Sequence, residues 1–204
     1  MENSTLNFYG KNSREITEKY ENLDMENLHQ KLIEVFSKKD NLLELGCGSG
    51  RDAAYLISQG YDVTVSDGSQ SMINEAIKLH PELTKNYCII RLPNKFLYPK
   101  ESFSGVYAIA VLMHLKIQEI GMVIEEISRI LTKDGKFFFS VYIIENDKVE
   151  SIVTPEGRFL TRMPKENWIK MCESSGFTSI SLLENNDVMG RDIQWCSFFM
   201  RKRK

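Results

Sequence analysis

Residues 42–52 read Leu42-Leu43-Glu44-Leu45-Gly46-Cys47-Gly48-Ser49-Gly50-Arg51-Asp52, an apolar run that leads into a loop with glycine at every second position. A helix-like segment, residues 53–59, follows at once. Glycine allows the backbone to turn through positive φ and lets a ligand lie against the main chain. The start of the following helix adds unpaired N–H groups. The stretch therefore predicts a strand, a ligand-binding loop and a helix in succession.

The spacing of the glycines discriminates between two classes of cofactor. Dinucleotide-binding loops follow G-x-G-x-x-G, whereas here the third glycine comes one residue early and Arg51 occupies the position that the fingerprint needs. Two carboxylates, Glu44 and Asp52, flank the turn. Negative charge is unfavourable beside a pyrophosphate but favourable beside an ammonium group. S-adenosylmethionine (SAM) carries an ammonium and a sulfonium and has no phosphate, so the loop favours SAM over NAD.

A second β-rich run, residues 61–67, ends in Asp67 about one βαβ unit after the loop. An acidic residue at that place can accept hydrogen bonds from both hydroxyls of a ribose. Asp67 therefore supports an adenosine-containing cofactor without choosing among such cofactors. The alternative is that Asp67 caps the N-terminus of the next helix.

Four blocks of sequence follow one another along the middle of the chain. They read E-L-G-C-G-S-G at 44–50, V-S-D-G-S-Q-S-M at 65–72, F-S-G-V-Y-A-I-A-V-L-M-H-L at 103–115 and L-T-K-D-G-K-F-F-F-S at 131–140. In this order and at this spacing they resemble the class I SAM-dependent methyltransferases. The fragments F-Y-G-K at 8–11 and G-R-D-I-Q-W at 190–195 are similar to a subgroup of small bacterial methyltransferases.

The alternation of strand and helix patterns predicts an α/β protein with a doubly wound, Rossmann-like sheet. Strands are expected at 42–46, 62–66, 87–92, 106–112, 136–144, 177–183 and 194–200, and helices at 53–59, 72–80, 118–131 and 165–175. The resemblance implies a seven-stranded sheet of order 3-2-1-4-5-7-6 with the last strand antiparallel. We expect an N-terminal helical lid over residues 1–38 and a methyltransferase domain over residues 39–204.

Composition narrows the range of functions. The length of 204 residues fits one domain with a substantial core. The formal net charge of −2 argues against nucleic-acid binding. The longest apolar run, residues 106–113, is too short to cross a bilayer, and no apolar leader is visible at the start. The four cysteines are scattered without metal-ligand spacing. We therefore expect a cytoplasmic, metal-free monomer or homodimer that does not bind membranes.

The resemblance also implies a set of cofactor contacts around the loop and the ends of neighbouring strands. The glycines would admit the methionine portion of SAM, while Glu44 would favour its ammonium group. Met72 could line the adenosine pocket or belong to the core of a helix. Asn94 stands where many family members carry an acid that binds the adenine amine. The expected contacts are Glu44, Gly46, Cys47, Gly48, Gly50, Asp67, Gly68, Met72, Asn94 and Ala110.

His114 follows the fourth expected strand, beside the place where methyl transfer should occur. It is the candidate catalytic residue, which could take a proton from the acceptor, but we favour a structural, pocket-lining role for it. Tyr9 and Tyr20 in the helical lid are expected to contact the substrate, because aromatic faces pack against a sulfonium cation and exclude water. Their alternative role is to hold the helix in place.

Arg191 in the C-terminal third of the chain is the remaining expected substrate contact. Arg158, Arg162 and Trp195 fall in the same part of the sequence. A pair of arginines would suit an anionic acceptor. The alternative for each arginine is a solvated position at the surface.

These features predict an enzyme that transfers a methyl group from SAM to a nitrogen or oxygen of a small molecule and leaves S-adenosylhomocysteine (SAH). The protein needs only to hold the acceptor in line with the C–S bond and exclude water. One alternative is a methyltransferase acting on tRNA, DNA or protein, which the charge balance and the lack of an N-P-P-Y-type sequence at 110–113 disfavour. A second alternative is a SAM-binding regulatory protein without turnover. An NAD-dependent enzyme is the weakest alternative, because the third glycine is misplaced.

Overall fold

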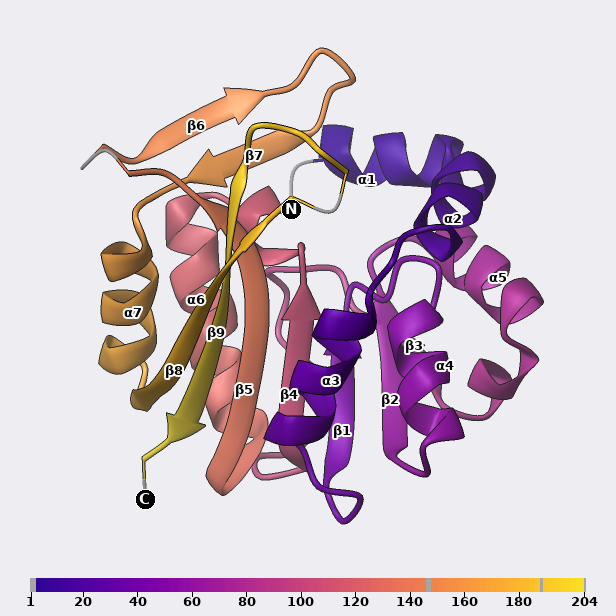
Figure 1. Cartoon of the computed structure of the whole chain (residues 1–204). Coiled ribbons are helices and arrows are strands. Elements are labelled where there is room, and N and C mark those ends of the chain that lie inside the picture. Colours follow the sequence, from indigo (N-terminus) through magenta and orange to yellow (C-terminus); the bar gives the residue numbers. More distant parts are fainter. Residues whose placement is uncertain (1–2, 146–147, 188, 204) are drawn as a thin grey trace.

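The computed structural model describes residues 3–145, 148–187 and 189–203 (Figure 1). Within them, one sheet has the strand order β3-β2-β1-β4-β5-β9-β8, and a separate hairpin consists of β6 and β7. The strands are β1 (Asn41–Leu45), β2 (Asp62–Asp67), β3 (Tyr87–Ile89), β4 (Phe103–Ile109), β5 (Leu131–Ile143), β6 (Glu150–Val153), β7 (Phe159–Arg162), β8 (Phe177–Asn186) and β9 (Gln194–Lys202). The α-helices are α1 (Asn3–Lys11), α2 (Ser13–Glu21), α3 (Glu26–Val35), α4 (Arg51–Ser58), α5 (Gln70–Leu79), α6 (Ile117–Ile130) and α7 (Lys165–Ser174). Two 3-10 helices are η1 (Pro81–Lys85) and η2 (Leu112–His114).

The predicted topology of the sheet is confirmed. Strands β3, β2, β1, β4 and β5 are parallel neighbours, whereas β9 runs antiparallel to both β5 and β8. Since β8 and β9 are the sixth and seventh strands of this sheet along the chain, the observed order is 3-2-1-4-5-7-6 with the last strand antiparallel. Strand β1 is apolar on both faces because helices cover both, as is usual in parallel sheets.

Two apolar clusters hold the helices against opposite faces of the sheet. Helices α3, α4 and α5 contribute to the cluster that contains Leu42, and α6 and α7 contribute to the cluster that contains Leu43. Adjacent residues of a strand point to opposite faces, so these two leucines identify the two sides. None of the described helices is both long and apolar enough to cross a membrane.

The end of strand β4 differs from the sequence prediction. The strand covers Phe103–Ile109 rather than residues 106–112. Ala110 has a φ of 58°, and the chain leaves the sheet there and enters η2. The apolar residues beyond Ile109 are buried without being part of the strand, which is why an apolar run placed the strand end too late.

Strands β5 and β3 also differ in length from their predictions. Strand β5 begins at Leu131 rather than at residue 136 and accommodates Asp134, whose φ is 59°, in an irregularity of the pairing with β4. Such a bulge keeps turn-forming residues inside a strand. Strand β3 ends at Ile89 rather than at residue 92, because its pairing with β2 stops there.

The β6–β7 hairpin lies where the sequence pattern predicted only a loop. It extends over the end of the sheet toward which β4 points, and α1 lies beside it (Figure 1). The backbone N–H of Phe159 donates a hydrogen bond of 2.8 Å to Oγ1 of Thr5 in α1. The hairpin and the N-terminal helices therefore meet above the carboxyl ends of the parallel strands, which is where ligands bind in open α/β sheets.

Candidate functional site

A cavity of about 1070 Å³ lies at the carboxyl ends of the parallel strands. The loop of residues 46–49 and the ends of β1, β2 and β4 form one part of its lining, and helices α1 and α2 form another. The β6–β7 hairpin and strand β9 complete it. The cavity thus joins residues from the beginning, middle and end of the chain, and its size suits a cofactor together with a small second ligand.

The glycine loop is held in a conformation that only glycine adopts easily. Gly46, Gly48 and Gly50 have φ values of 71°, 59° and 83°. A Cβ added to Gly46 would lie 2.4 Å from Cγ2 of Val111, and one added to Gly48 would lie 3.3 Å from the Tyr20 ring. Both neighbours line the cavity. The loop therefore forms a surface of bare backbone against which a ligand such as the methionine portion of SAM fits.

Asp67 is the last residue of strand β2 and binds the backbone of the glycine loop. Its Oδ2 accepts a hydrogen bond of 3.3 Å from the N–H of Gly48, and its Oδ1 accepts one of 2.9 Å from the N–H of Ser69. Burial raises the pKa of this carboxyl to about 6. The N-cap of helix α5 is Ser69, whose Oγ accepts from the N–H of Met72, so Asp67 does not serve as the cap and its carboxylate faces the cavity.

The raised pKa of Asp67 predicts a pH dependence for cofactor binding. Ribose hydroxyls donate to the ionised carboxylate, so the affinity for SAH should be full above the pKa and fall as the pH drops through about 6, approaching about 10-fold per unit. Without a bound ligand, the stability of the fold depends on pH with the opposite sign. The raised pKa lowers the stability of the fold as the pH rises from 3.8 to about 6, because the folded state binds the proton more tightly than the unfolded chain.

Calorimetric titration with SAH between about pH 5 and about pH 8 measures this dependence. Burial also raises the pKa of Glu44, so the variant Asp67→Asn separates the two carboxyls. A wild-type profile no steeper than that of the variant would contradict the assignment to Asp67.

Glu44 offers a buried carboxylate to a cationic ligand. Its side chain is 2% exposed, lines the cavity and has no hydrogen-bond partner for Oε2 among the described residues. Burial and the nearby charge of Asp52 raise the pKa of Glu44. A buried carboxylate oxygen without a partner is costly, and an ammonium group beside it would remove that cost. The orphaned oxygen and the bare glycine backbone together fit the amino-acid end of SAM.

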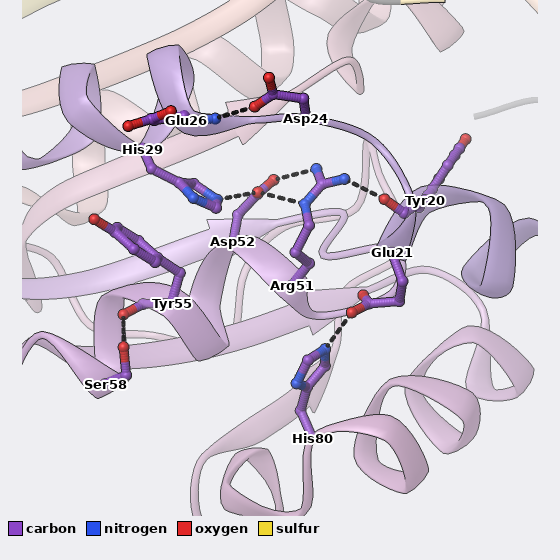
Figure 2. A network of polar contacts seen from close by, with 10 residues as sticks. All are labelled: Tyr20, Glu21, Asp24, Glu26, His29, Arg51, Asp52, Tyr55, Ser58 and His80. Atoms are coloured by element: carbon purple, nitrogen blue, oxygen red, sulfur yellow. Dashed lines mark hydrogen bonds and ion pairs between the residues drawn. The ribbon is translucent and has the colours of Figure 1, made fainter.

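A polar network connects helices α2 and α3 to the first turn of α4 (Figure 2). Oδ1 of Asp52 lies 2.8 Å from Nε2 of His29 and accepts a hydrogen bond of 3.0 Å from Nε of Arg51. The Arg51 guanidinium also donates to the carbonyl oxygen of Tyr20. The sequence placed Asp52 beside the ammonium group, but its oxygens are already bound within this network, which leaves Glu44 for that role.

The network should contribute strongly to stability. Burial alone would raise the pKa of Asp52, but the hydrogen bond with His29 and the charge of Arg51 outweigh it and hold the pKa below its usual range. This contribution is present above the ordinary carboxyl pKa and is lost as the pH falls. We expect Asp52→Asn to lower the free energy of unfolding by about 3 kcal/mol, because it leaves a buried cation unpaired.

Urea denaturation of Asp52→Asn and of the matched control Asp62→Asn measures this contribution. Asp62 is the exposed first residue of β2, and its replacement should change the free energy of unfolding little. Equal midpoints for the two variants would show that the network adds no stability.

His114 lies in η2 with both ring nitrogens bound. Its Nδ1 donates a hydrogen bond of 2.9 Å to the carbonyl oxygen of Phe159, so its Nε2 accepts one of 3.0 Å from the hydroxyl of Tyr9. Burial lowers the pKa of His114 to about 4 and raises that of Tyr9 well above its usual value. The pair is therefore neutral near pH 7, and the histidine fixes the hydroxyl of Tyr9 at the cavity wall.

Some of the other expected cofactor contacts line the cavity, and the rest do not. Cys47, Gly68, Met72 and Ala110 line the cavity, and Met72 is also fully buried in the core. Gly50 is the N-cap of α4 and packs toward Leu83 instead, while Asn94 is not part of the cavity lining. The apolar side chains of the lining that the sequence motifs did not indicate include Leu6, Ile90, Leu92, Val111 and Met113.

A cluster around Tyr142, the penultimate residue of β5, forms another part of the cavity wall. Arg191 lines it, but both its Nε and Nη2 donate to the carboxylate of Asp187, at 2.9 and 2.7 Å. Asp187 also accepts a hydrogen bond of 2.8 Å from the indole N–H of Trp195. The hydrogen bonds from Arg191 lower the pKa of Asp187 far below its usual range. Asp187 was not indicated by the sequence, although it lies within hydrogen-bonding reach of two residues that were.

No group of three histidine, cysteine, aspartate or glutamate side chains within the described part of the chain could hold a metal ion. The four cysteines are free thiols. The lining of the cavity contains the carboxylates, the Tyr9–His114 pair and the arginines described above.

Comparison with known proteins adds a family and a fold. Residues 43–139 match a family model described as a methyltransferase domain. No curated protein matches the sequence. The Burkholderia thailandensis 1,6-didemethyltoxoflavin-N1-methyltransferase, solved with 1,6-didemethyltoxoflavin and SAH, superimposes with a TM-score of 0.83 at 18% identity, covering 98% of this chain and 88% of that one.

Two further structures share the fold. A chain solved with the Haloferax volcanii Trm112 methyltransferase activator has a TM-score of 0.79 at 15% identity, with 98% of each chain covered. A SAM-dependent methyltransferase from Methanosarcina mazei has a TM-score of 0.74 at 16% identity, covering 85% of this chain and 97% of that one. At these identities the similarity establishes the fold, and the family match concerns residues 43–139.

Proposed function

We propose that this chain, whose residues 43–139 match a methyltransferase-domain model, is a class I SAM-dependent methyltransferase that methylates a nitrogen or oxygen of a small molecule. The observation that carries the proposal is the continuous cavity. It is lined at one end, the cofactor end, by the glycine loop, Glu44 and Asp67. At the other end, the acceptor end, it is lined by His114, Tyr142 and the arginines of the hairpin.

Each residue of the cofactor end would contact a different part of SAM. Asp67 would accept hydrogen bonds from the ribose, the bare backbone of Gly46 and Gly48 would lie along the methionine portion, and Glu44 would neutralise the ammonium group. Bound SAM supplies a methyl group that its sulfonium makes electrophilic. The protein then has to orient an acceptor and keep water out, and no nucleophilic side chain is required.

The Tyr9–His114 pair would position the acceptor. His114 has a low pKa and two occupied nitrogens, so it would act by fixing the hydroxyl of Tyr9 rather than by taking a proton directly. The Tyr9 hydroxyl retains lone pairs that can accept a hydrogen bond from an acceptor N–H or O–H. We propose Tyr9 as the residue that touches the acceptor and His114 as its positioning residue.

The enclosure of the cavity favours a small acceptor. Helices α1 and α2 and the β6–β7 hairpin all contribute to its lining, and a site surrounded in this way suits a small acceptor. The relative that binds 1,6-didemethyltoxoflavin is named as an N-methyltransferase of that small molecule, and it supports this class of acceptor. The formal net charge of −2 gives the protein no overall electrostatic attraction for nucleic acid.

Calorimetric titration of the purified protein with SAM, SAH and NAD tests the proposal, followed by a screen of small amines, phenols and heterocycles for SAH release. We expect binding of SAM and SAH, no binding of NAD, and turnover with a member of the screen. Salt-sensitive retention of tRNA or DNA with no turnover of small molecules would favour a macromolecular acceptor. SAM binding with no transfer to any nucleophile would favour a regulatory protein.

A further inference from the structure

The cavity has opposite electrostatic character at its two ends. Glu44 and Asp67 place carboxylates at the cofactor end. Three arginines line the acceptor end, namely Arg158, Arg162 and Arg191. Burial raises the pKa of Tyr142, and the charges of these three arginines oppose that rise, so all three act on the same phenol. Positive charge is thus gathered around Tyr142.

Arg191 is already neutralised within the protein. Its guanidinium forms two hydrogen bonds with the carboxylate of Asp187, whose side chain is 1% exposed. A bidentate pair of this kind satisfies most of the binding capacity of both groups. Arg191 therefore contributes to the wall of the acceptor end, and its charge is balanced there.

Arg158 keeps unused hydrogen-bond donors. Its Nε is buried and has no partner among the described residues, and its guanidinium lies 5.2 Å from the centroid of the Phe8 ring. The nearest acid is Glu156, 3.6 Å from Nη2 and 53% exposed, a pair that contributes little in water. A buried donor without a partner is costly, and a ligand that accepts from it would remove the cost.

Arg162 lies on the same side of the cavity and is also free of acidic partners. Its guanidinium lies 5.5 Å from the centroid of the Tyr142 ring, with Nε 3.5 Å from the hydroxyl oxygen. It forms no ion pair with any acidic side chain in residues 3–145, 148–187 and 189–203. Arg158 and Arg162 flank strand β7 of the hairpin, one before it and one at its end, so two uncompensated guanidinium groups approach the cavity from one element.

We propose that the methyl acceptor carries an anionic group, a carboxylate or a phosphate, and that Arg158 and Arg162 bind it. The proposal rests on the proposed function, since it concerns the acceptor of the same reaction. Planar guanidinium groups match the oxygen pairs of both anions with two parallel hydrogen bonds. The anion would hold the acceptor at the hairpin, on the side of the cavity opposite the carboxylates that hold the cationic end of SAM.

Binding of matched charged and neutral probes tests the proposal without knowledge of the natural acceptor. The probes are benzoate, phenyl phosphate and the neutral analogue benzamide, each titrated into protein saturated with SAH. Trp195 lines the acceptor end, whereas Trp168 is fully buried, so the fluorescence of Trp195 reports binding and calorimetry confirms it. We expect at least one anion to bind about 10-fold or more tightly than benzamide, because a charged hydrogen-bond pair is roughly twice as strong as a neutral one.

Variants of the two arginines assign the effect to them. Arg158→Gln and Arg162→Gln should each weaken anion binding about 10-fold or more and leave benzamide unchanged, and Arg158→Lys should fall between Arg158→Gln and the wild type. The control Arg201→Gln replaces an exposed arginine of β9 and should behave as wild type. The SAH affinity of every variant, which should not change, shows that the fold and the cofactor end are intact.

Three results would overturn the proposal. They are equal binding of benzamide and the anions, no binding of either anion to the SAH complex, and anion binding that survives in Arg158→Gln and Arg162→Gln. Failure of the wild type to bind SAH at all would instead remove the proposed function, and this inference with it. The two failures are therefore distinguishable.

Discussion

Replacement of Asp67 by alanine is expected to raise the Kd for SAH about 100-fold or more, since hydrogen bonds to a charged group contribute ~1.5–3 kcal/mol each. The variant removes the proposed acceptor of both ribose hydroxyls. It also removes the two hydrogen bonds through which the carboxylate holds the N–H groups of Gly48 and Ser69. Calorimetric titration with SAH measures the effect.

Two further variants make this result interpretable. Asp62→Ala removes an aspartate from the other, exposed end of the same strand and should bind SAH as the wild type does. Asp67→Asn keeps one acceptor oxygen for the backbone N–H groups, so it separates loss of ribose binding from loss of loop geometry. If Asp67→Ala binds SAH with wild-type affinity, the assignment of β2 to the ribose is wrong.

Substitution of Gly46 by alanine should have the second large effect, on both stability and binding. The new Cβ would lie 2.4 Å from Cγ2 of Val111, at a residue whose φ is 71°. The positive φ costs about 1–2 kcal/mol, and the overpacking adds about 1–3 kcal/mol. Relief of the clash has to displace either Val111 or the loop, and both line the cavity, so SAH affinity should fall about 100-fold.

Gly60 offers a matched control for this substitution. Its φ is 87°, and a Cβ added there would meet no atom within 4 Å. Gly60→Ala therefore carries the backbone strain without the clash and without any link to the cavity. Thermal denaturation should show a smaller loss of stability for Gly60→Ala than for Gly46→Ala, with unchanged SAH binding. Equal losses in the two variants would mean that the contact with Val111 is relieved at no cost.

The sheet was largely predictable because each sequence feature that indicates one of its strands lies within a short stretch of the chain. The apolar runs, the glycine loop and the acid at 67 each occupy one short stretch, and the family resemblance that these stretches carry implies the strand order that the structure confirms. The strand ends were less predictable. Ala110 leaves the usual backbone region at a φ of 58°, which alanine as a residue type does not signal, and the turn-forming Asp134, at a φ of 59°, lies inside a strand instead of ending one. Hairpin β6–β7 was not predicted, because its two strands are four residues each and, in the described part of the chain, form a two-stranded sheet of their own.

The cofactor end of the site was easier to predict than the acceptor end for the same reason. Glu44 and Asp67 belong to recognisable motifs, but the roles of Asp52 and His114 depend on partners brought from elsewhere, namely His29 and the hydroxyl of Tyr9. A sequence shows which side chains can ionise, but it does not show which of them are already bound. The same limit applied to Arg191, whose charge is balanced by an aspartate that no motif indicated.

The hydrogen bond between Thr5 and Phe159 joins residues separated by 154 positions in the chain, and this separation has a consequence for synthesis. On the ribosome, helix α1 emerges long before the hairpin that it rests against, and Trp195 emerges later still. Contacts so distant along the chain form late, because the intervening segment must first be ordered. We therefore expect the pocket to close, and the capacity to sequester SAM to appear, only after the residues as far as Trp195 have been made.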